Sequence, residues 1–251
     1  MVKIINAYNV SDLYEVFKDV PQDTFIFIDI DDTIITPVSH AFRTKSPYKT
    51  MIDELKASPH LFPNHERILS AWRLQRKVML TDTSWPALLE SLRRKYKTFA
   101  LTKMESGHVG NISSMEEWRY TELQELNIFF TPELKDSAKI QEKLFHKNRS
   151  GIFWKGIFIT GSLKKSDVLE AIFSYHIPEK VIFIDDREDQ IEDVANACTR
   201  HAISFVGILY KGVSQIPGQT NHRLADFQKK YLLEKEIWLE DEEAQKKFRK
   251  K

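Results

Sequence analysis

Residues 24–33 read TFIFIDIDDT, and this stretch decides the fold. Its first five residues are β-branched or aromatic and form a run too short for a helix, so they predict a buried strand over 24–28. Continuous apolar runs, as opposed to alternating ones, are typical of a parallel sheet that is covered on both faces. Three carboxylates follow within four residues, and they are Asp29, Asp31 and Asp32.

Four more runs of the same kind predict further strands, at 98–101, 156–160, 180–184 and 203–209. Between and before the runs lie segments whose apolar residues recur on one helical face. These predicted helices span 7–18, 85–96, 115–126, 166–175 and 189–198. Alternating strands and helices, joined by right-handed crossovers, predict an α/β protein with a doubly wound, mostly parallel sheet.

The segment 37–77 interrupts this alternation of strands and helices. It contains no strand-like run but has helical patterns at 51–56 and 66–76. We interpret it as a small helical insert over one edge of the sheet. The predicted organisation is therefore a core of residues 1–36 and 78–251, with the insert at 37–77. The charged tail from residue 221 onward predicts a helix that docks on the rest of the protein through a few apolar side chains.

Composition excludes several functional classes. The chain has 37 Lys and Arg against 36 Asp and Glu, a net charge of +1, which argues against a dedicated nucleic-acid surface. Its single cysteine, Cys198, excludes an internal disulfide and a cysteine-based zinc site. Only 8 residues are glycine, where average usage would give roughly 18. The shortage excludes the glycine-rich phosphate loops of dinucleotide-binding and P-loop proteins.

The N-terminal residues lack an apolar region long enough for a secretory signal. No run reaches the roughly 18 apolar residues of a transmembrane helix. We therefore expect no membrane association and a cytoplasmic protein, or a secreted one if a signal has been removed.

A second acidic cluster, Asp185 and Asp186, follows the predicted strand at 180–184. In an open parallel sheet, ligands bind beyond the carboxyl ends of the strands, at the point where the strand order reverses. Two acidic clusters at one sheet edge repel each other unless a cation lies between them. Oxygen ligands without His or Cys suit Mg²⁺. The alternative, a strand end with a capped turn, suits Asp32 or Thr33 taken alone.

Residues 29–33, DIDDT, resemble the DxDxT signature of the haloacid dehalogenase (HAD) superfamily of phosphohydrolases. Residues 25–33 also resemble the opening motif of bacterial class B-like acid phosphatases. Beyond the motifs, the chain resembles an uncharacterised bacterial branch of HAD-like proteins. The resemblance implies a HAD-like Rossmannoid core, and it implies a cap at the position of the 37–77 insert.

The resemblance also implies a Thr or Ser at the end of the next core strand. Thr81 and Thr102 both follow short apolar runs, and we choose Thr102 because a predicted helix precedes its strand. A third motif is a lysine at the start of a helix. Lys164 and Lys165 are both candidates, and we choose Lys165 because Leu169 supplies the apolar residue four positions later.

As the resemblance implies, Asp29 attacks phosphorus and forms an aspartyl-phosphate. Asp31 protonates the leaving group and then activates water. The Thr102 hydroxyl binds a phosphoryl oxygen, and Lys165 offsets the charge of the carboxylates.

The acidic pair resembles the metal motif of the same family. Mg²⁺ is then expected to bind Asp29, the main-chain carbonyl of Asp31, and Asp185. Asp186 is expected to bind the metal through water or to orient Lys165.

The predicted function is a Mg²⁺-dependent phosphohydrolase that acts on a small phosphate monoester. HAD dehalogenases usually lack an acid two residues after the nucleophile, so the resemblance implies that Asp31 favours phosphate monoesters over halogenated acids. Two alternatives remain open, a catalytically silent HAD-fold scaffold and a phosphotransferase. In the insert, Arg43 or Lys45 is a candidate to meet a substrate anion, although a solvated helical face is the more common reason for such a residue.

Overall fold

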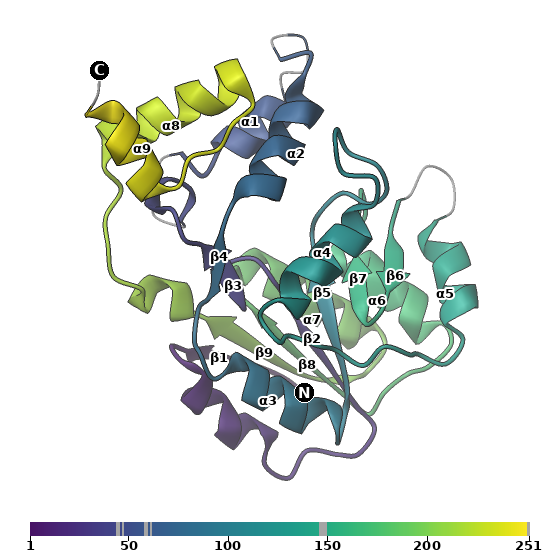
Figure 1. Ribbon diagram of the computed structural model, residues 1–251. Helices are drawn as coiled ribbons and strands as arrows, with labels where there is room; N and C mark the ends of the chain where they lie inside the picture. Colours follow the sequence, from purple (N-terminus) through teal and green to yellow (C-terminus); the bar gives the residue numbers. More distant parts are fainter. Residues whose placement is uncertain (44–45, 47, 58–59, 61, 146–149, 250–251) are drawn as a thin grey trace.

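A computed structural model describes residues 1–43, 46, 48–57, 60, 62–145 and 150–249 (Figure 1). Its centre is a seven-stranded sheet in which all neighbouring strands are parallel except for the last pair. In spatial order the strands are β1 (Val2–Ala7), β9 (Ser204–Tyr210), β8 (Lys180–Asp185), β2 (Thr24–Ile28), β5 (Lys97–Thr102), β7 (Ile157–Ile159) and β6 (Ile152–Trp154). The predicted α/β fold with a doubly wound, mostly parallel sheet is confirmed.

Helices cover both faces of this sheet, which is why the central strands read as continuous apolar runs. In β2, Phe25 and Phe27 pack into the core on one face, and Ile26 and Ile28 pack into the core on the other. The phenylalanine face is covered by α5 (Ser137–Leu144), α6 (Lys165–Phe173) and α7 (Glu188–Arg200). The isoleucine face is covered by the 3₁₀-helix η1 (Val10–Phe17), α3 (Trp85–Arg93) and α4 (Met115–Gln124).

The structure differs from the predicted elements mainly at the edges of the sheet. Strand β1, α5 and β6 were not predicted, and the predicted helix at 7–18 forms as the shorter η1. Most residues of β1 are exposed, so this strand carries no apolar run. Strand β6 pairs antiparallel with β7 across Lys155 and Gly156. Both turn residues have positive φ, 46° and 89°, as a tight two-residue hairpin turn requires.

A two-stranded antiparallel sheet marks both ends of the predicted insert. Strand β3 (Ile35–Pro37) carries the chain away from the core, and β4 (Val78–Leu80) brings it back. Between them lie the 3₁₀-helix η2 (His40–Phe42), α1 (Met51–Ala57) and α2 (His65–Gln75). The helical character predicted for this segment is therefore present.

The C-terminal tail packs on the insert, although the sequence-based division grouped it with the core. Figure 1 shows α8 (His222–Lys235) and α9 (Asp241–Phe248) beside α1 and α2, away from the main sheet. A separate apolar cluster joins the two segments, and in it the ring of Phe42 lies 5.0 Å from those of Trp72 and Trp238. The short helices of the insert bury their apolar faces against the tail, so the two segments share one small core.

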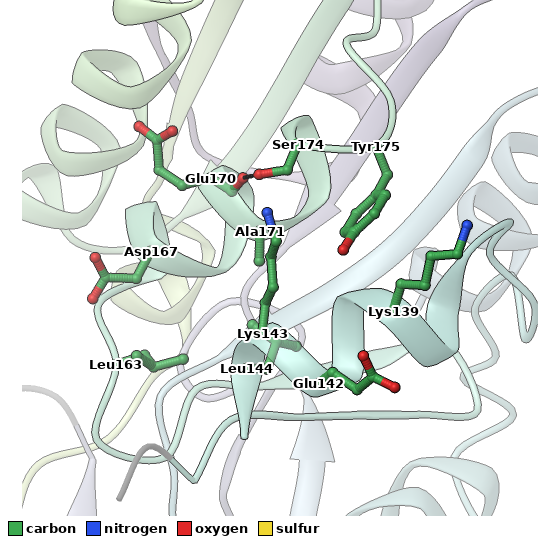
Figure 2. A pocket seen from close by; sticks show the side chains of 10 residues that line it. All are labelled: Lys139, Glu142, Lys143, Leu144, Leu163, Asp167, Glu170, Ala171, Ser174 and Tyr175. Carbon is green, nitrogen blue, oxygen red and sulfur yellow. Dashed lines mark hydrogen bonds between the residues drawn. The ribbon is translucent and has the colours of Figure 1, made fainter. Parts of the chain in front are cut away.

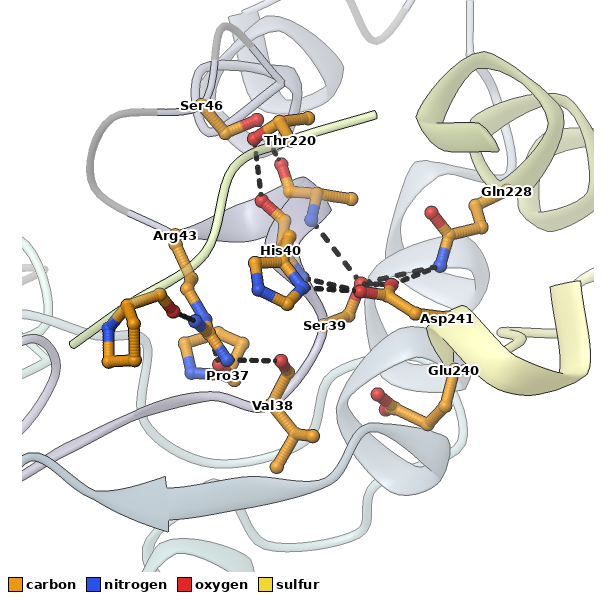
Figure 3. Close-up of polar contacts among 12 residues, drawn as sticks. Pro37, Val38, Ser39, His40, Arg43, Ser46, Thr220, Gln228, Glu240 and Asp241 are labelled. Carbon is orange, nitrogen blue, oxygen red and sulfur yellow. Dashed lines mark hydrogen bonds and ion pairs between the residues drawn. The ribbon is translucent and has the colours of Figure 1, made fainter. Parts of the chain in front are cut away.

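Polar contacts reinforce this attachment (Figure 3). The carboxylate of Asp241 accepts hydrogen bonds from the Ser39 hydroxyl at 2.5 Å and from the Gln228 amide at 2.9 Å. It also lies 2.7 Å from Nδ1 of His40 and accepts the backbone N–H of that residue. The first residue of α9 is thereby tied to the start of the insert.

Arg43 serves the backbone of the same region. Its guanidinium donates to the carbonyls of Pro37 and Val38 (Figure 3), and also to that of Pro217. These bonds hold the entry to the insert against the chain that leads into the tail. Lys45, the other candidate for an anion contact, lies outside the described residues.

Helix length bears on membrane insertion, because a spanning helix needs about 20 consecutive apolar residues. Among the described residues the longest helix is α8, with 14 residues. No helix in the described part of the chain is long and apolar enough to cross a membrane.

Candidate active site

The strand order fixes where a ligand site is expected. From β2 the chain adds β5 and β7 on one side, and then crosses over to add β8 and β9 on the other. The order therefore reverses between β2 and β8, and in such sheets ligands bind beyond the carboxyl ends of the strands at this point. Asp29 directly follows β2, Asp185 ends β8, and the Asp29 N–H donates to the carbonyl of Ile184 at 2.8 Å.

Three carboxylates meet at this position. Asp29, Asp185 and Asp186 each offer an oxygen atom, and these atoms lie within 4.8 Å of one another. Asp29 is 7% exposed and Asp185 is 1% exposed. The structure thus brings together both acidic clusters that the sequence placed at strand ends.

Lys165 lies between the acids. Its ammonium is 2.5 Å from Oδ1 of Asp29 and 2.6 Å from Oδ2 of Asp185, and the residue is 2% exposed. Lys164, the alternative candidate, is exposed. Helix α6 begins at Lys165, and its second residue, Ser166, donates from both its N–H and its hydroxyl to Asp193 of α7. The start of α6 is therefore held so that Lys165 points into the acidic cluster.

Burial and mutual repulsion raise the pKa values of the acids. The pKa of Asp29 is raised well above its ordinary value, first by burial, while Lys165 opposes the shift and Asp185 and Asp186 add to it. Burial, with Asp185 as the next contributor, raises the pKa of Asp186 to about 7. Burial alone would lower the pKa of Lys165, but Asp29 and Asp185 raise it. One ammonium among three acids leaves an excess of negative charge.

This donor set fits Mg²⁺. The three side chains offer carboxylate oxygens, which are the ligands that hard divalent cations prefer. A cation there would also relieve the repulsion that raises the pKa values of Asp29 and Asp186.

We expect Mg²⁺ binding to weaken below pH 7. The Asp186 carboxyl must lose its proton to act as a ligand, so with a pKa of about 7 the affinity should fall roughly tenfold per pH unit in acid. In the metal-free protein, the same carboxyl gives the stability of the fold a pH dependence of the opposite sign. A raised pKa makes the group's contribution to stability fall as pH rises from about 4 to about 7. Titration calorimetry at pH 6 and pH 8 measures the affinity, with Asp186→Asn as the variant that should reduce its pH dependence.

A cavity of about 220 Å³ opens at the cluster, and we call it the acid pocket. It is lined by all six residues that the sequence assigned to the site, together with five others. The lining is Asp29, Asp31, Asp32, Lys49, Thr102, Lys103, Lys165, Asp185, Asp186, Arg187 and Gln190. Thr102 ends β5, beside β2 in the main sheet, and is buried. Thr81 instead donates to the carbonyl of Thr33 and does not line the pocket.

A family model matches residues 6–245, a range that includes the whole acid pocket. The chain belongs to this family, which is described as "Protein of unknown function (DUF2608)". It is also 30% identical over 260 residues to an uncharacterised protein of Rickettsia prowazekii (strain Madrid E), covering 99% of this chain and 92% of that relative. No solved structure matches the chain.

Asp31 lines the acid pocket but lies outside the three-carboxylate group. Its carboxylate accepts a hydrogen bond of 2.7 Å from Arg119 and is 3.6 Å from Arg76. Burial acts to raise the pKa of Asp31, but Arg119, Arg76 and Arg73 outweigh it, and the pKa is lowered. Its side chain is still 43% exposed to the pocket. Asp31 is therefore held as a charged carboxylate in this DUF2608 protein.

Asp32 has a local structural role. It adopts the left-handed conformation, with φ of 61°, in the turn between β2 and β3, and its carboxylate accepts the Thr36 hydroxyl at 2.8 Å. It also pairs with Lys49 of the insert. This agrees with the capped-turn interpretation of Asp32 taken alone.

Sequence reasoning missed three arginines beside the site, Arg73, Arg76 and Arg119. Arg73 and Arg119 are only 7% and 3% exposed, and the side chain of Arg76 is 5% exposed. Arginines in charged helical segments are usually solvated, so charge alone did not mark these residues as buried. A usable signal was the interleaving of Arg with Trp at 72–73 and 118–119. The guanidinium of Arg76 stacks over Trp72 at 4.7 Å, and that of Arg119 over Trp118 at 4.9 Å.

A larger hollow, of about 820 Å³, lies between α5 and α6 (Figure 2). Lys143 stands over the ring of Tyr175 there at 5.0 Å, and Glu142, Asp167 and Glu170 contribute acids. None of the predicted site residues lines it. Its size therefore does not make it the candidate site, because the converging acids and the buried lysine lie elsewhere.

Burial also removes the single cysteine from consideration as a nucleophile. Cys198 is 0% exposed in α7, and burial raises the pKa of its thiol to about 12. A reactive cysteine needs an accessible thiolate. Cys198 instead fills the apolar core.

Proposed function

We propose that this protein is a Mg²⁺-dependent phosphohydrolase of the HAD type that cleaves a phosphate monoester. The observation that carries the proposal is the buried Lys165 ammonium, bound to Asp29 and Asp185 at the switch point of the sheet. Burying two acids and a lysine together, with a third acid half-buried beside them, is costly for stability. Such an arrangement suits a site that binds a charged group.

Asp29 is the proposed nucleophile. Its carboxylate attacks phosphorus in line with the departing alkoxide, and the P–O bond to that alkoxide breaks as the aspartyl-phosphate forms. Water then attacks the phosphorus of this acyl phosphate, which releases inorganic phosphate and restores the Asp29 carboxylate. Lys165 and Thr102, which line the same pocket, are placed to bind phosphoryl oxygens.

Asp29, Asp185 and Asp186 would hold the metal. When bound there, Mg²⁺ would neutralise phosphoryl charge and help to align the phosphate with Asp29.

Asp31 is the proposed proton-transfer residue, because its exposed carboxylate lines the acid pocket two residues from the nucleophile. Its pairing with Arg119 keeps it charged, and this suits the base that activates water in the second step. To protonate the leaving alkoxide in the first step, Asp31 must first turn away from Arg119 and take up a proton from solvent, which it then gives to the alkoxide.

Turnover and ligand binding by the purified protein test the proposal together. We expect hydrolysis of p-nitrophenyl phosphate that is lost with EDTA and restored by Mg²⁺. We also expect Mg²⁺ with beryllium fluoride, a mimic of the phosphoryl group, to raise the melting temperature. Absence of both effects would refute the enzyme and favour a scaffold. Transfer of phosphate mainly to added glycerol would replace hydrolase by phosphotransferase.

A further inference from the structure

A second cavity, also of about 220 Å³, continues the acid pocket towards the insert. The two share Asp31, Asp32, Lys49 and Lys103 in their linings. The remaining lining residues come from the insert and from the segments that follow β5. They are Pro37, Phe42, Trp72, Arg73, Arg76, Met104 and Arg119. We call this space the arginine cavity, and a ligand with its phosphate at Asp29 can extend into it.

Cations dominate the wall of the arginine cavity. Five lining residues are Lys or Arg, whereas the acids among them are Asp31 and Asp32. The carboxylates that balance the three arginines lie mostly outside the lining. Glu105 pairs with Arg73 at 2.7 Å, and Glu122 pairs with both Arg76 and Arg119. The lining itself therefore carries more cations than acids, while the glutamates that pair with the arginines are not part of the lining.

Asp31 is one of the two acids that line both cavities. It pairs with Arg119 and lies within reach of Arg76, yet the proposed chemistry needs it at the leaving oxygen. When Asp31 turns, Arg76 and Arg119 are left to share the single carboxylate of Glu122. Two buried guanidiniums that share one carboxylate leave one positive charge unbalanced, and an unbalanced buried charge is destabilising. An anion arriving in the cavity would replace the contact that Asp31 gives up.

Arg73 is a third buried cation at this cavity, and it also favours binding of an anion there. It is 7% exposed and comes from α2 in the insert, opposite Arg119 of the core. Burial lowers its pKa, and although Glu105 opposes this, Arg76 and Arg119 lower the pKa further. The three guanidiniums therefore repel one another, and a shared negative ligand would relieve this repulsion.

We propose, on the basis of the phosphatase activity proposed above, that the arginine cavity binds a second anionic group of the substrate. The substrate is then a small phosphate monoester that also carries a carboxylate or a second phosphate. Guanidinium groups recognise both anions through paired hydrogen bonds. The aromatic wall of Phe42 and Trp72 and the cavity volume of about 220 Å³ favour a compact metabolite over a phosphoprotein.

Matched substrates test this with the unmodified protein. We expect carboxyalkyl phosphates and alkane bisphosphates to have kcat/KM values roughly tenfold or more above those of hydroxyalkyl phosphates of the same length. A series of increasing chain length finds the spacing of the two anions, and the two anionic arms distinguish carboxylate from phosphate. Equal kcat/KM across all three series, with p-nitrophenyl phosphate still hydrolysed, would overturn the second-anion site alone. No turnover of any ester would overturn the phosphatase itself.

Arg73→Gln locates the effect. We expect it to reduce the preference for the second anion, measured as a ratio of kcat/KM values, by about tenfold. Arg67→Gln is the matched control, because Arg67 lies on the same helix, is 63% exposed and pairs with Glu236. Should Arg73→Gln fail to fold, Arg73→Lys keeps the charge, loses the paired geometry and should still lower the ratio. An unchanged ratio in a folded Arg73 variant would contradict the proposal.

Discussion

Asp29→Asn is expected to reduce kcat for Mg²⁺-dependent hydrolysis of p-nitrophenyl phosphate by on the order of 10⁴-fold. An amide has nearly the shape of a carboxylate but cannot attack phosphorus. The substitution leaves Lys165 with its contact to Asp185 at 2.6 Å, so the start of α6 should stay in place. Steady-state kinetics with equal concentrations of folded protein measure the effect.

The same substitution is expected to cost little stability, which separates chemistry from folding. The pKa of Asp29 is raised in the folded protein, chiefly by burial, so its charged form is less favoured there than in the unfolded chain. A neutral amide therefore removes an unfavourable charge as well as one contact to Lys165. We expect the free energy of unfolding to change by about 1 kcal/mol or less.

Asp19→Asn is the matched control for this prediction. Asp19 is exposed, precedes β2 at the opposite end from the site, and has a φ of 52°, which Asn accepts readily. It should leave both turnover and stability unchanged. Wild-type turnover in Asp29→Asn would remove Asp29 as the nucleophile and refute the proposed mechanism.

The centre of the fold could be predicted from sequence because the burial of each central strand leaves a signal in the strand's own residues. Residues 24–28 and 180–184 are apolar at every position or nearly so, since helices bury both faces of β2 and β8. The edge strands β1 and β6 are only partly buried and so lacked this signal. The docking of α8 on α2 depends on which apolar surfaces meet in space, and no local pattern encodes that.

The candidate site likewise has features that sequence could predict and one that it could not. The convergence of Asp29 and Asp185 follows from strand direction alone, because parallel strands deliver their carboxyl ends to one edge. The choice of Lys165 over Lys164 rested on the apolar residue at position 169, and the structure places Lys165 among the acids. The turn of Asp31 towards Arg119 could not be predicted, because it depends on the position of α4 beside the sheet.

Lys165→Met is expected to lower both stability and turnover strongly. Methionine preserves much of the length of the side chain but removes the only ammonium that contacts both Asp29 and Asp185 among the described residues. Breaking a buried ion pair from one side typically costs about 3–5 kcal/mol, because the remaining charges stay buried and unpaired. We expect a loss of this size in metal-free buffer, measured by urea denaturation, together with loss of phosphatase turnover.

Lys164→Met separates this effect from a general loss of charge at the start of α6. Lys164 is the adjacent residue and is exposed, so its variant should keep both stability and turnover. Metal supplies a second comparison. Because Lys165→Met leaves three clustered acids without their ammonium, Mg²⁺ should raise the melting temperature of this variant more than that of the wild type. If Lys165→Met is as stable as Lys164→Met in EDTA, the buried ammonium does not hold the acids together, and the electrostatic basis of the proposed site fails.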